Sequence, residues 1–195
     1  MQKNIMPAVL KETSAGFVRY QLQDAMLLKR EIDCVGEITT EMVNALILQL
    51  RYLQQEDAKK QITMYINSPG GEVTAGLALY DVMQALSCPV RTVCVGLAAS
   101  MSALIFMCGK QRDILPNARV MIHDPLVTGN IGGSALKMES MSRDLMKVRE
   151  VTGRIIARHT GKELEEIFVR TATDSYFDAK EAVDFGMADR IIKKI

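Results

Sequence analysis

Short strand-like stretches alternate with longer amphipathic stretches along most of this chain. Residues 62–66, 90–95 and 120–122 are short runs rich in apolar side chains, and each lies beside a turn-forming residue. Residues 73–86, and a stretch from about 39 to 57, repeat apolar side chains at the spacing of a helix. This order predicts an α/β fold, and 195 residues suffice for one domain with a full hydrophobic core.

The helix limits follow from capping residues. Thr39 or Thr40 can cap the helix that we expect to continue to about Asp57. Its predicted buried side carries Met42, Leu46, Leu50 and Leu53. Shorter helices at 162–170 and 179–185, and a strand at 190–192, complete the domain.

One helical pattern is unusually long and runs from Ser134 to about His159. A helix of this length can protrude beyond one globular body. Apolar residues recur along it, namely Leu136, Met138, Met141, Leu145, Val148, Val151, Ile155 and Ile156. This apolar stripe predicts a contact between subunits, and packing within the domain is the alternative.

Ser100 lies between a predicted strand and a predicted helix. Small side chains surround it in the run from Gly96 to Ala103, so its hydroxyl can be presented with little steric cover. The N–H groups at the start of the following helix point back toward this junction. A serine nucleophile with an oxyanion site needs this arrangement, although small residues at such a junction can also serve packing alone.

The chain has only two histidines, His123 and His159. His123 follows the predicted strand 120–122, and Pro125 prevents that strand from continuing. His159 lies just before Gly161 at a predicted helix end, where a cationic imidazole would complement the helix dipole. We therefore expect a structural role for His159, and His123 is the candidate general base.

Two other segments offer partners for this pair. The strand 62–66 leads into Asn-Ser-Pro-Gly-Gly, in which Gly70 and Gly71 can supply N–H groups to an oxyanion hole; an ordinary turn is the alternative. Asp174 lies in a predicted loop, 171–177, and could orient the histidine. Spacing does not select it among 23 acidic residues, and a capping or turn role is its alternative.

Six stretches occur together along nearly the whole chain, from about Met6 to Ile192. They are YINSPGG (65–71), TAGLALYD (74–81), AASM (98–101), LPNARVMIH (115–123), HTG (159–161) and EAVDFG (181–186). In this order they resemble the ClpP family of self-compartmentalising serine peptidases. The resemblance implies a ClpP/crotonase-like superhelix of ββα units with a protruding handle helix at about 134–159.

The resemblance also implies roles for individual residues. Ser100 would be the nucleophile, His123 the base and Asp174 the orienting acid, with backbone N–H donors at Gly71 and Met101. No cofactor or metal ion is implied.

Domain organisation and partners follow from the same resemblance. It implies an N-terminal axial segment at 1–18 and a single peptidase domain at 19–195. Peptides or unfolded proteins would be cleaved inside heptameric rings, stacked as a tetradecamer. The partner would be a AAA+ Clp ATPase, and a ClpP paralogue is a further candidate partner.

The chain departs from the family pattern where rings meet. Ala172 and Thr173 replace the acidic residue and Arg that usually precede the catalytic aspartate. The stretch 133–137 reads Gly-Ser-Ala-Leu-Lys in place of Gly-Gln-Ala-x-Asp/Glu, with about two extra residues before it. In the family these positions bridge the two rings, so we expect stacking to depend on other contacts.

Three further departures affect the surface on which the family docks its ATPase. Thr63, Ala85 and Asp113 stand where family members often carry aromatic residues. A carboxylate in an apolar cleft would raise the desolvation cost of docking a hydrophobic loop. Partnership with an unfoldase is therefore less firmly implied than peptidase chemistry. Ser102 also replaces a common Gly after Ser-Met.

Composition excludes several functional classes. The net charge is +1 and no Lys/Arg run predicts a nucleic-acid surface. No secretory signal and no run of 18 apolar residues is present, so a soluble cytoplasmic protein with no membrane contact is expected. The four cysteines lack CxxC spacing and lie in apolar surroundings, which predicts buried thiols.

Two other functions compete with the peptidase hypothesis. A structural or weakly active ring subunit that pairs with a ClpP paralogue would account for the altered ring contacts. An acyl-CoA enzyme of the crotonase type would share the fold but would leave Ser100, His123 and Asp174 unexplained.

Overall fold

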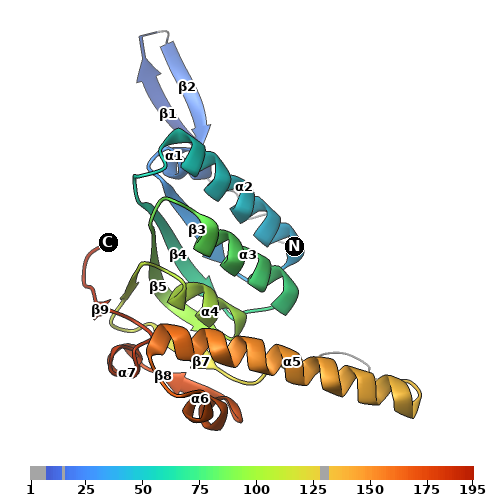
Figure 1. The fold of residues 1–195 in the computed structure, drawn as a ribbon. Helices are drawn as coiled ribbons and strands as arrows, with labels where there is room; N and C mark the ends of the chain where they lie inside the picture. Colours follow the sequence, from blue (N-terminus) through green and yellow to red (C-terminus); the bar gives the residue numbers. More distant parts are fainter. Residues whose placement is uncertain (1–7, 15, 128–131) are drawn as a thin grey trace.

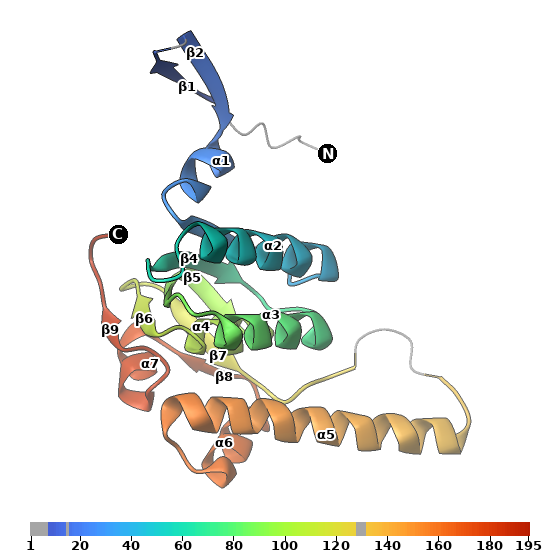
Figure 2. The same ribbon diagram turned by 45° about the horizontal axis from the view of Figure 1, so that its top comes forward.

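A mostly parallel sheet forms the centre of the protein in the computed structural model, which describes residues 8–14, 16–127 and 132–195 (Figures 1 and 2). Five parallel strands follow one another across it: β3 (Glu31–Val35), β4 (Ile62–Ser68), β5 (Val90–Ala99), β6 (Gln111–Ile114) and β9 (Arg190–Ile191). The second half of β5 pairs with β7 (Arg119–Ile122), and β7 pairs antiparallel with β8 (Ser175–Phe177). The sheet confirms the predicted α/β class; the superhelix of ββα units stays a prediction.

Helices flank this sheet, some in contact with its strands and others packed on neighbouring helices. Their bounds are α1 (Leu22–Leu27), α2 (Thr40–Glu56), α3 (Val73–Ala85), α4 (Met101–Met107), α5 (Ala135–Thr160), α6 (Leu164–Thr171) and α7 (Ala179–Phe185). Each of α2, α3, α4 and α5 contacts the next one in the chain (Figure 1). All residues of α4 are buried, so the helix that follows Ser100 is fixed in the core.

Most helix and strand assignments made from the sequence are confirmed, but several bounds differ; Thr171, for example, was predicted in a loop and is the last residue of α6. Thr39 is the N-cap of α2, but Val43 is buried there whereas Met42 is only partly covered. Strand β5 continues to Ala99, beyond the predicted end at residue 95. Residues 175–177, predicted as part of a loop, form β8.

Helix α5 matches the predicted long helix within one residue at each end. Ser134 caps its start and Gly161 ends it in a left-handed conformation with φ 71°. Its C-terminal part packs on the body through Gly153, Ile155 and Ile156. Its N-terminal part extends away from the body, and Leu136 there is 77% exposed (Figure 2). Its function as a handle between subunits stays a prediction.

The N-terminal segment forms a projecting hairpin of β1 (Ala8–Thr13) and β2 (Gly16–Gln21) (Figure 1). It overlaps the predicted axial segment 1–18, of which residues 1–7 and 15 lie outside the described residues. The predicted insertion after Pro125 likewise falls largely on 128–131, outside the described residues.

The cysteines confirm the predicted buried thiols. Cys34, Cys88, Cys94 and Cys108 are all free and buried. Burial raises the thiol pKa of Cys34 and Cys94 to about 12 and that of Cys108 to about 11. Within the described ranges, no helix is long and apolar enough to cross a membrane.

Candidate active site

Ser100 occupies a sharp turn between β5 and α4. Ala99 is the last residue of the strand and Met101 is the first of the helix. Ser100 has φ 54° and ψ −123°, a backbone conformation that residues other than Gly rarely adopt. Its N–H donates to Met121 O at 2.8 Å, which holds the turn against β7. The turn leaves the Ser100 hydroxyl where the strand ends, a geometry similar to the strand-to-helix turn that carries the nucleophile in α/β-hydrolases.

Strand pairing brings His123 to Ser100. Ala99 pairs with Met121 across β5 and β7, so the residues that follow each strand meet at the same edge. His123 Nε2 lies 2.8 Å from Ser100 Oγ. The histidine side chain is only 14% exposed. This is the contact that a general base requires of a serine nucleophile.

Asp174 lies on the side of the second ring nitrogen of His123, Nδ1. Ile122 pairs with Ser175 across β7 and β8, which places Asp174 next to His123. The distance from Asp174 Oδ1 to His123 Nδ1 is 4.0 Å, longer than a hydrogen bond. The Asp174 side chain is 62% exposed. The structure therefore brings together all three residues, but only Ser100 and His123 are in hydrogen-bond contact.

The Gly-Gly turn approaches Ser100 closely. A Cβ atom on Gly70 would lie 2.7 Å from Ser100 Cβ, and Gly70 has φ 94°, so this position suits only glycine. The Gly70 N–H donates to Ser68 Oγ at 3.1 Å. Within the described part of the chain, the Gly71 N–H forms no hydrogen bond. Of the two glycines considered as donors, Gly71 is therefore the one with a free N–H group.

Met101 offers a second backbone donor. As the first residue of α4, it has an N–H with no acceptor inside the helix. The Met101 nitrogen would lie 3.1 Å from a Cβ on Gly70, so the helix start adjoins the Gly-Gly turn. Met101 lines the hollow beside Ser100 and Gly71 lines the adjoining cleft that also includes Ser100, so both backbone groups lie near the serine.

The buried hydroxyl of Ser102 contacts the main chain on both sides of the site, a role that the sequence did not predict. The hydroxyl oxygen lies 2.8 Å from the main-chain oxygens of both Ser68 and Ala99, and the side chain is fully buried. The hydroxyl therefore links the strand end before the Gly-Gly turn to the strand end before Ser100. The sequence singled out Ser102 only as a replacement of a common Gly, and a polar residue in an otherwise apolar helix was the signal for a buried hydrogen bond.

An apolar hollow adjoins the Ser100–His123 pair. Its lining comprises Val73, Met101, Leu104, Ile122, Pro125, Thr152 and Ile156, besides the pair itself. A larger cleft adjoins it, shares Ser100 and His123 with it, and extends past Gly71 to two carboxylates, Glu37 and Glu72. No three His, Cys, Asp or Glu side chains gather as metal ligands within the described residues.

His159 lies in the last turn of α5 and does not line the hollow or the cleft beside Ser100, and its predicted cationic state is wrong. Its Nε2 is 3.0 Å from Tyr80 Oη. Burial, followed by the positive charges of Arg112, Arg158 and Lys110, lowers the His159 pKa to about 4. The imidazole is therefore neutral at pH 7 and hydrogen-bonds to Tyr80.

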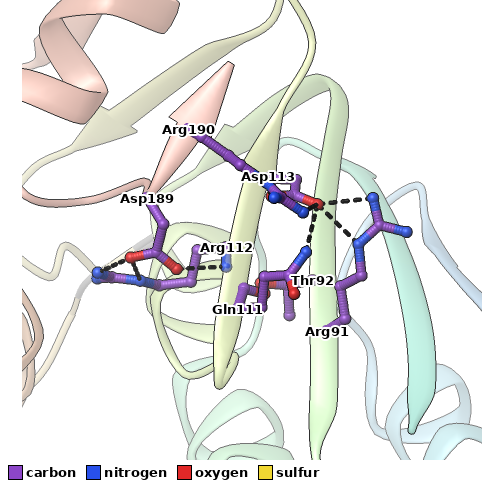
Figure 3. Close-up of polar contacts among 7 residues, drawn as sticks. All are labelled: Arg91, Thr92, Gln111, Arg112, Asp113, Asp189 and Arg190. Carbon is purple, nitrogen blue, oxygen red and sulfur yellow. Dashed lines mark hydrogen bonds and ion pairs between the residues drawn. The ribbon is translucent and has the colours of Figure 1, made fainter. Parts of the chain in front are cut away.

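Asp113 is fully buried, but it is paired (Figure 3). Arg91 Nη2 lies 2.6 Å and Arg190 Nε 2.8 Å from its carboxylate oxygens, and Gln111 donates at 2.9 Å. Burial raises the pKa of this carboxyl, but hydrogen bonds from Arg190, Gln111 and Arg91 outweigh burial and lower it. Asp113 was expected to be an isolated carboxylate in an apolar cleft. It instead belongs to an ion-pair cluster formed by side chains of β5, β6 and β9.

A serine–histidine pair at a strand-to-helix turn, with free N–H groups beside it, is the arrangement that serine hydrolases use. A family model for Clp protease matches residues 14–195, so the chain belongs to the Clp protease family. This confirms the family identified from the sequence. Membership gives the chain a peptidase role with peptides as substrates.

Proposed function

We propose that this chain is a serine endopeptidase that hydrolyses peptides and unfolded proteins inside an oligomeric ring chamber. One observation carries the proposal: the 2.8 Å contact between Ser100 Oγ and His123 Nε2 in a member of the Clp protease family. The two free N–H groups beside Ser100 and the nearby carboxylate of Asp174 support the same chemistry.

The reaction proceeds through an acyl-enzyme. Ser100 Oγ attacks the scissile carbonyl carbon while His123 Nε2 accepts the hydroxyl proton. The N–H groups of Gly71 and Met101 stabilise the negative oxygen that develops. His123 then gives its proton to the leaving amine, and water releases the acyl group in a second round. Asp174 keeps the imidazole in the tautomer that has its proton on Nδ1.

The apolar hollow gives this reaction its substrate preference. It opens directly beside Ser100 and is lined mainly by aliphatic and methionine side chains. We infer that its apolar lining contacts an apolar side chain next to the scissile bond, because removing apolar surface from water stabilises the complex by about 25 cal/mol per Å².

Assembly completes the proposed enzyme. By family resemblance the chain forms heptameric rings, stacked as a tetradecamer, in the cytoplasm and receives substrates from a AAA+ unfoldase. The 4.0 Å gap between His123 and Asp174, together with the exposure of Asp174, supports low activity of free monomers. Neighbouring subunits would then bring Asp174 into hydrogen-bond contact with His123.

Replacing Ser100 tests the proposal. Ser100→Ala should abolish both hydrolysis of a fluorogenic peptide and labelling by a fluorophosphonate, while the far-UV circular dichroism spectrum stays unchanged. His123→Ala should have a comparable effect, because residues that act as a unit lose activity together. Each size-exclusion fraction would be assayed, so that assembly and activity are measured on the same sample. Full activity of folded Ser100→Ala would contradict the proposal.

A second candidate is a weakly active ring subunit that pairs with a ClpP paralogue. The open His123–Asp174 contact and the altered ring-contact positions 172–173 favour it. In that case the assembled protein alone should label slowly, and adding a paralogue should increase labelling at Ser100.

A further inference from the structure

Asp124, the residue after His123, binds to the segment that leads to Asp174. Its N–H donates to Thr171 O at 2.7 Å, and its carboxylate accepts from Thr171 Oγ1 at 2.5 Å. Thr171 is the last residue of α6 and is 4% exposed. Since Asp174 lies only three residues further, Asp124 fixes the start of the connection that carries it.

Arg149, in the middle of α5, binds the same Asp124 carboxylate. Asp124, Thr171 and Arg149 together are called the Asp124 cluster. Arg149 Nε donates to the second Asp124 oxygen at 2.6 Å, and both side chains are more than two-thirds covered. The guanidinium carbon lies 3.9 Å from the ring centroid of Phe168 in α6. A planar guanidinium that both stacks and donates has little freedom to move, so it holds the carboxylate in one position.

The cluster closes a ring of contacts around the His123–Asp174 pair. On one side β7 pairs with β8 through Ile122 and Ser175, so the two residues leave neighbouring strands. On the other side Asp124 is bound to Thr171. The spacing between His123 and Asp174 is therefore set at both ends, by the sheet at one and by the Asp124 cluster at the other.

We propose that Asp124 and Arg149 are positioning residues, which fix the main chain beside His123 and leading to Asp174, so that the 4.0 Å gap between the two side chains can close in the assembled protein. This proposal rests on the proposed peptidase function. Neither side chain contacts Ser100, so their effect is exerted through the main chain on either side of the histidine. It also makes α5 part of the catalytic framework, since Arg149 is the α5 residue that contacts Asp124.

Two substitutions test this with little change of shape. Asp124→Asn keeps an oxygen for Thr171 but removes the charge that binds Arg149. Arg149→Gln removes the guanidinium. Each should lower kcat for a fluorogenic peptide by about tenfold to a hundredfold, the usual effect of a misplacement of about 1 Å. KM should stay within about twofold, because the apolar hollow is untouched. The rate of fluorophosphonate labelling should fall in parallel.

A matched control comes from the same helix. Arg154 pairs with Glu150 at 2.5 Å on the exposed side of α5, away from His123. Arg154→Gln should leave kcat, KM and the labelling rate unchanged. Arg149→Lys, which keeps the charge, should recover part of the lost kcat and also serves if Arg149→Gln does not fold. The double variant Asp124→Asn with Arg149→Gln should be no slower than the slower single variant, because both act through one contact.

The outcomes separate this proposal from the proposed function. Wild-type protein that neither hydrolyses peptide nor labels at Ser100 would remove the peptidase itself. Active wild type with an unchanged kcat in folded Asp124→Asn and folded Arg149→Gln would overturn the positioning role alone; if Arg149→Gln does not fold, an unchanged kcat in Asp124→Asn is sufficient. A lowered melting temperature with full kcat would show that the pair stabilises the fold and does nothing more.

Discussion

Ser100 is held in a conformation that costs free energy. A non-glycine residue with φ 54° and ψ −123° lies outside the regions that side chains favour, at a cost of about 1–3 kcal/mol. The surroundings enforce it: the N–H of Ser100 is bound to Met121 O, and Ala103 N–H donates to Ser100 O. Residues that keep such strain are found preferentially at functional sites, which agrees with the proposed role of Ser100 as the nucleophile.

Replacing Ser100 by two different residues measures this strain. Ser100→Gly should be more stable than Ser100→Ala by about 1 kcal/mol, because glycine adopts positive φ without a steric penalty. Both variants should lack peptidase activity. Urea unfolding of the two proteins at the same pH would provide the comparison. Equal midpoints, or a more stable alanine variant, would show that the turn is not strained.

Asp174 is the member of the triad whose position fits its proposed role least well. Its carboxylate lies 4.0 Å from His123 Nδ1, so the two groups must move closer before Asp174 can accept a hydrogen bond from the histidine. Asp174→Asn should nevertheless lower kcat in the assembled protein by orders of magnitude, about 10⁴ in a well-formed triad, because an amide favours the wrong imidazole tautomer. Asp184, with the same 62% side-chain exposure, is a matched control, since Asp184→Asn removes a carboxylate bound to Lys180. Unchanged turnover of assembled Asp174→Asn would remove it from the triad.

Strand β8 explains what the sequence could not predict about the site. Its three residues, Ser175 to Phe177, are too few for a periodic signal, and their pairing with β7 is a contact between distant parts of the chain. Without that pairing, nothing in the residues around Asp174 separates it from other acidic residues. The family resemblance supplied this assignment. By contrast, Thr39, Ser134 and Gly161 are local signals, and the structure confirms the helix ends that they predicted.

The C-terminal turn of α5 should make the fold sensitive to acid through His159. In the unfolded chain this imidazole has its ordinary pKa of 6.5, whereas in the folded protein its pKa is about 4. The unfolded state therefore takes up a proton first as the pH falls, so stability is lost between about pH 6.5 and 4. Urea midpoints measured across this range should fall more steeply for the wild type than for His159→Gln. Parallel curves would show that His159 does not contribute.

For the whole molecule, the sequence predicted the fold class and the buried cysteines correctly. It predicted the surroundings of charged residues less well. Buried cysteines and the α/β class follow from local apolar patterns, which folding preserves. The surroundings of Asp113 could not be read in this way, because its partners Arg91 and Arg190 come from strands that are far apart in the sequence (Figure 3). Any partner that docks over these strands meets the exposed part of Arg190, which is 60% exposed, in place of aromatic side chains.

The proposed stacking of two rings involves positions at which this chain departs from its family. The family bridges its rings between an Arg before the catalytic aspartate and polar groups of the handle, and this chain carries Thr173 and Lys137 at those positions. Loss of one charged hydrogen bond costs about 1.5–3 kcal/mol, and ring symmetry repeats that loss at every equivalent contact. We therefore expect seven-membered rings whose stacking is weaker than is usual for the family. Thr173→Arg combined with Lys137→Glu should favour the double ring in native mass spectra.

Helix α5 can accept this change, because residue 137 is the third residue of the helix and its N–H already donates to the Ser134 cap at 3.4 Å. A glutamate there can complete a capping box and lies at the positive end of the helix dipole. Lys137→Glu alone is therefore the necessary control, since it stabilises α5 without restoring the bridge, and it should leave the ratio of single to double rings unchanged. A wild-type double ring that persists at nanomolar concentration and does not respond to the paired substitution would show that other contacts hold the rings together.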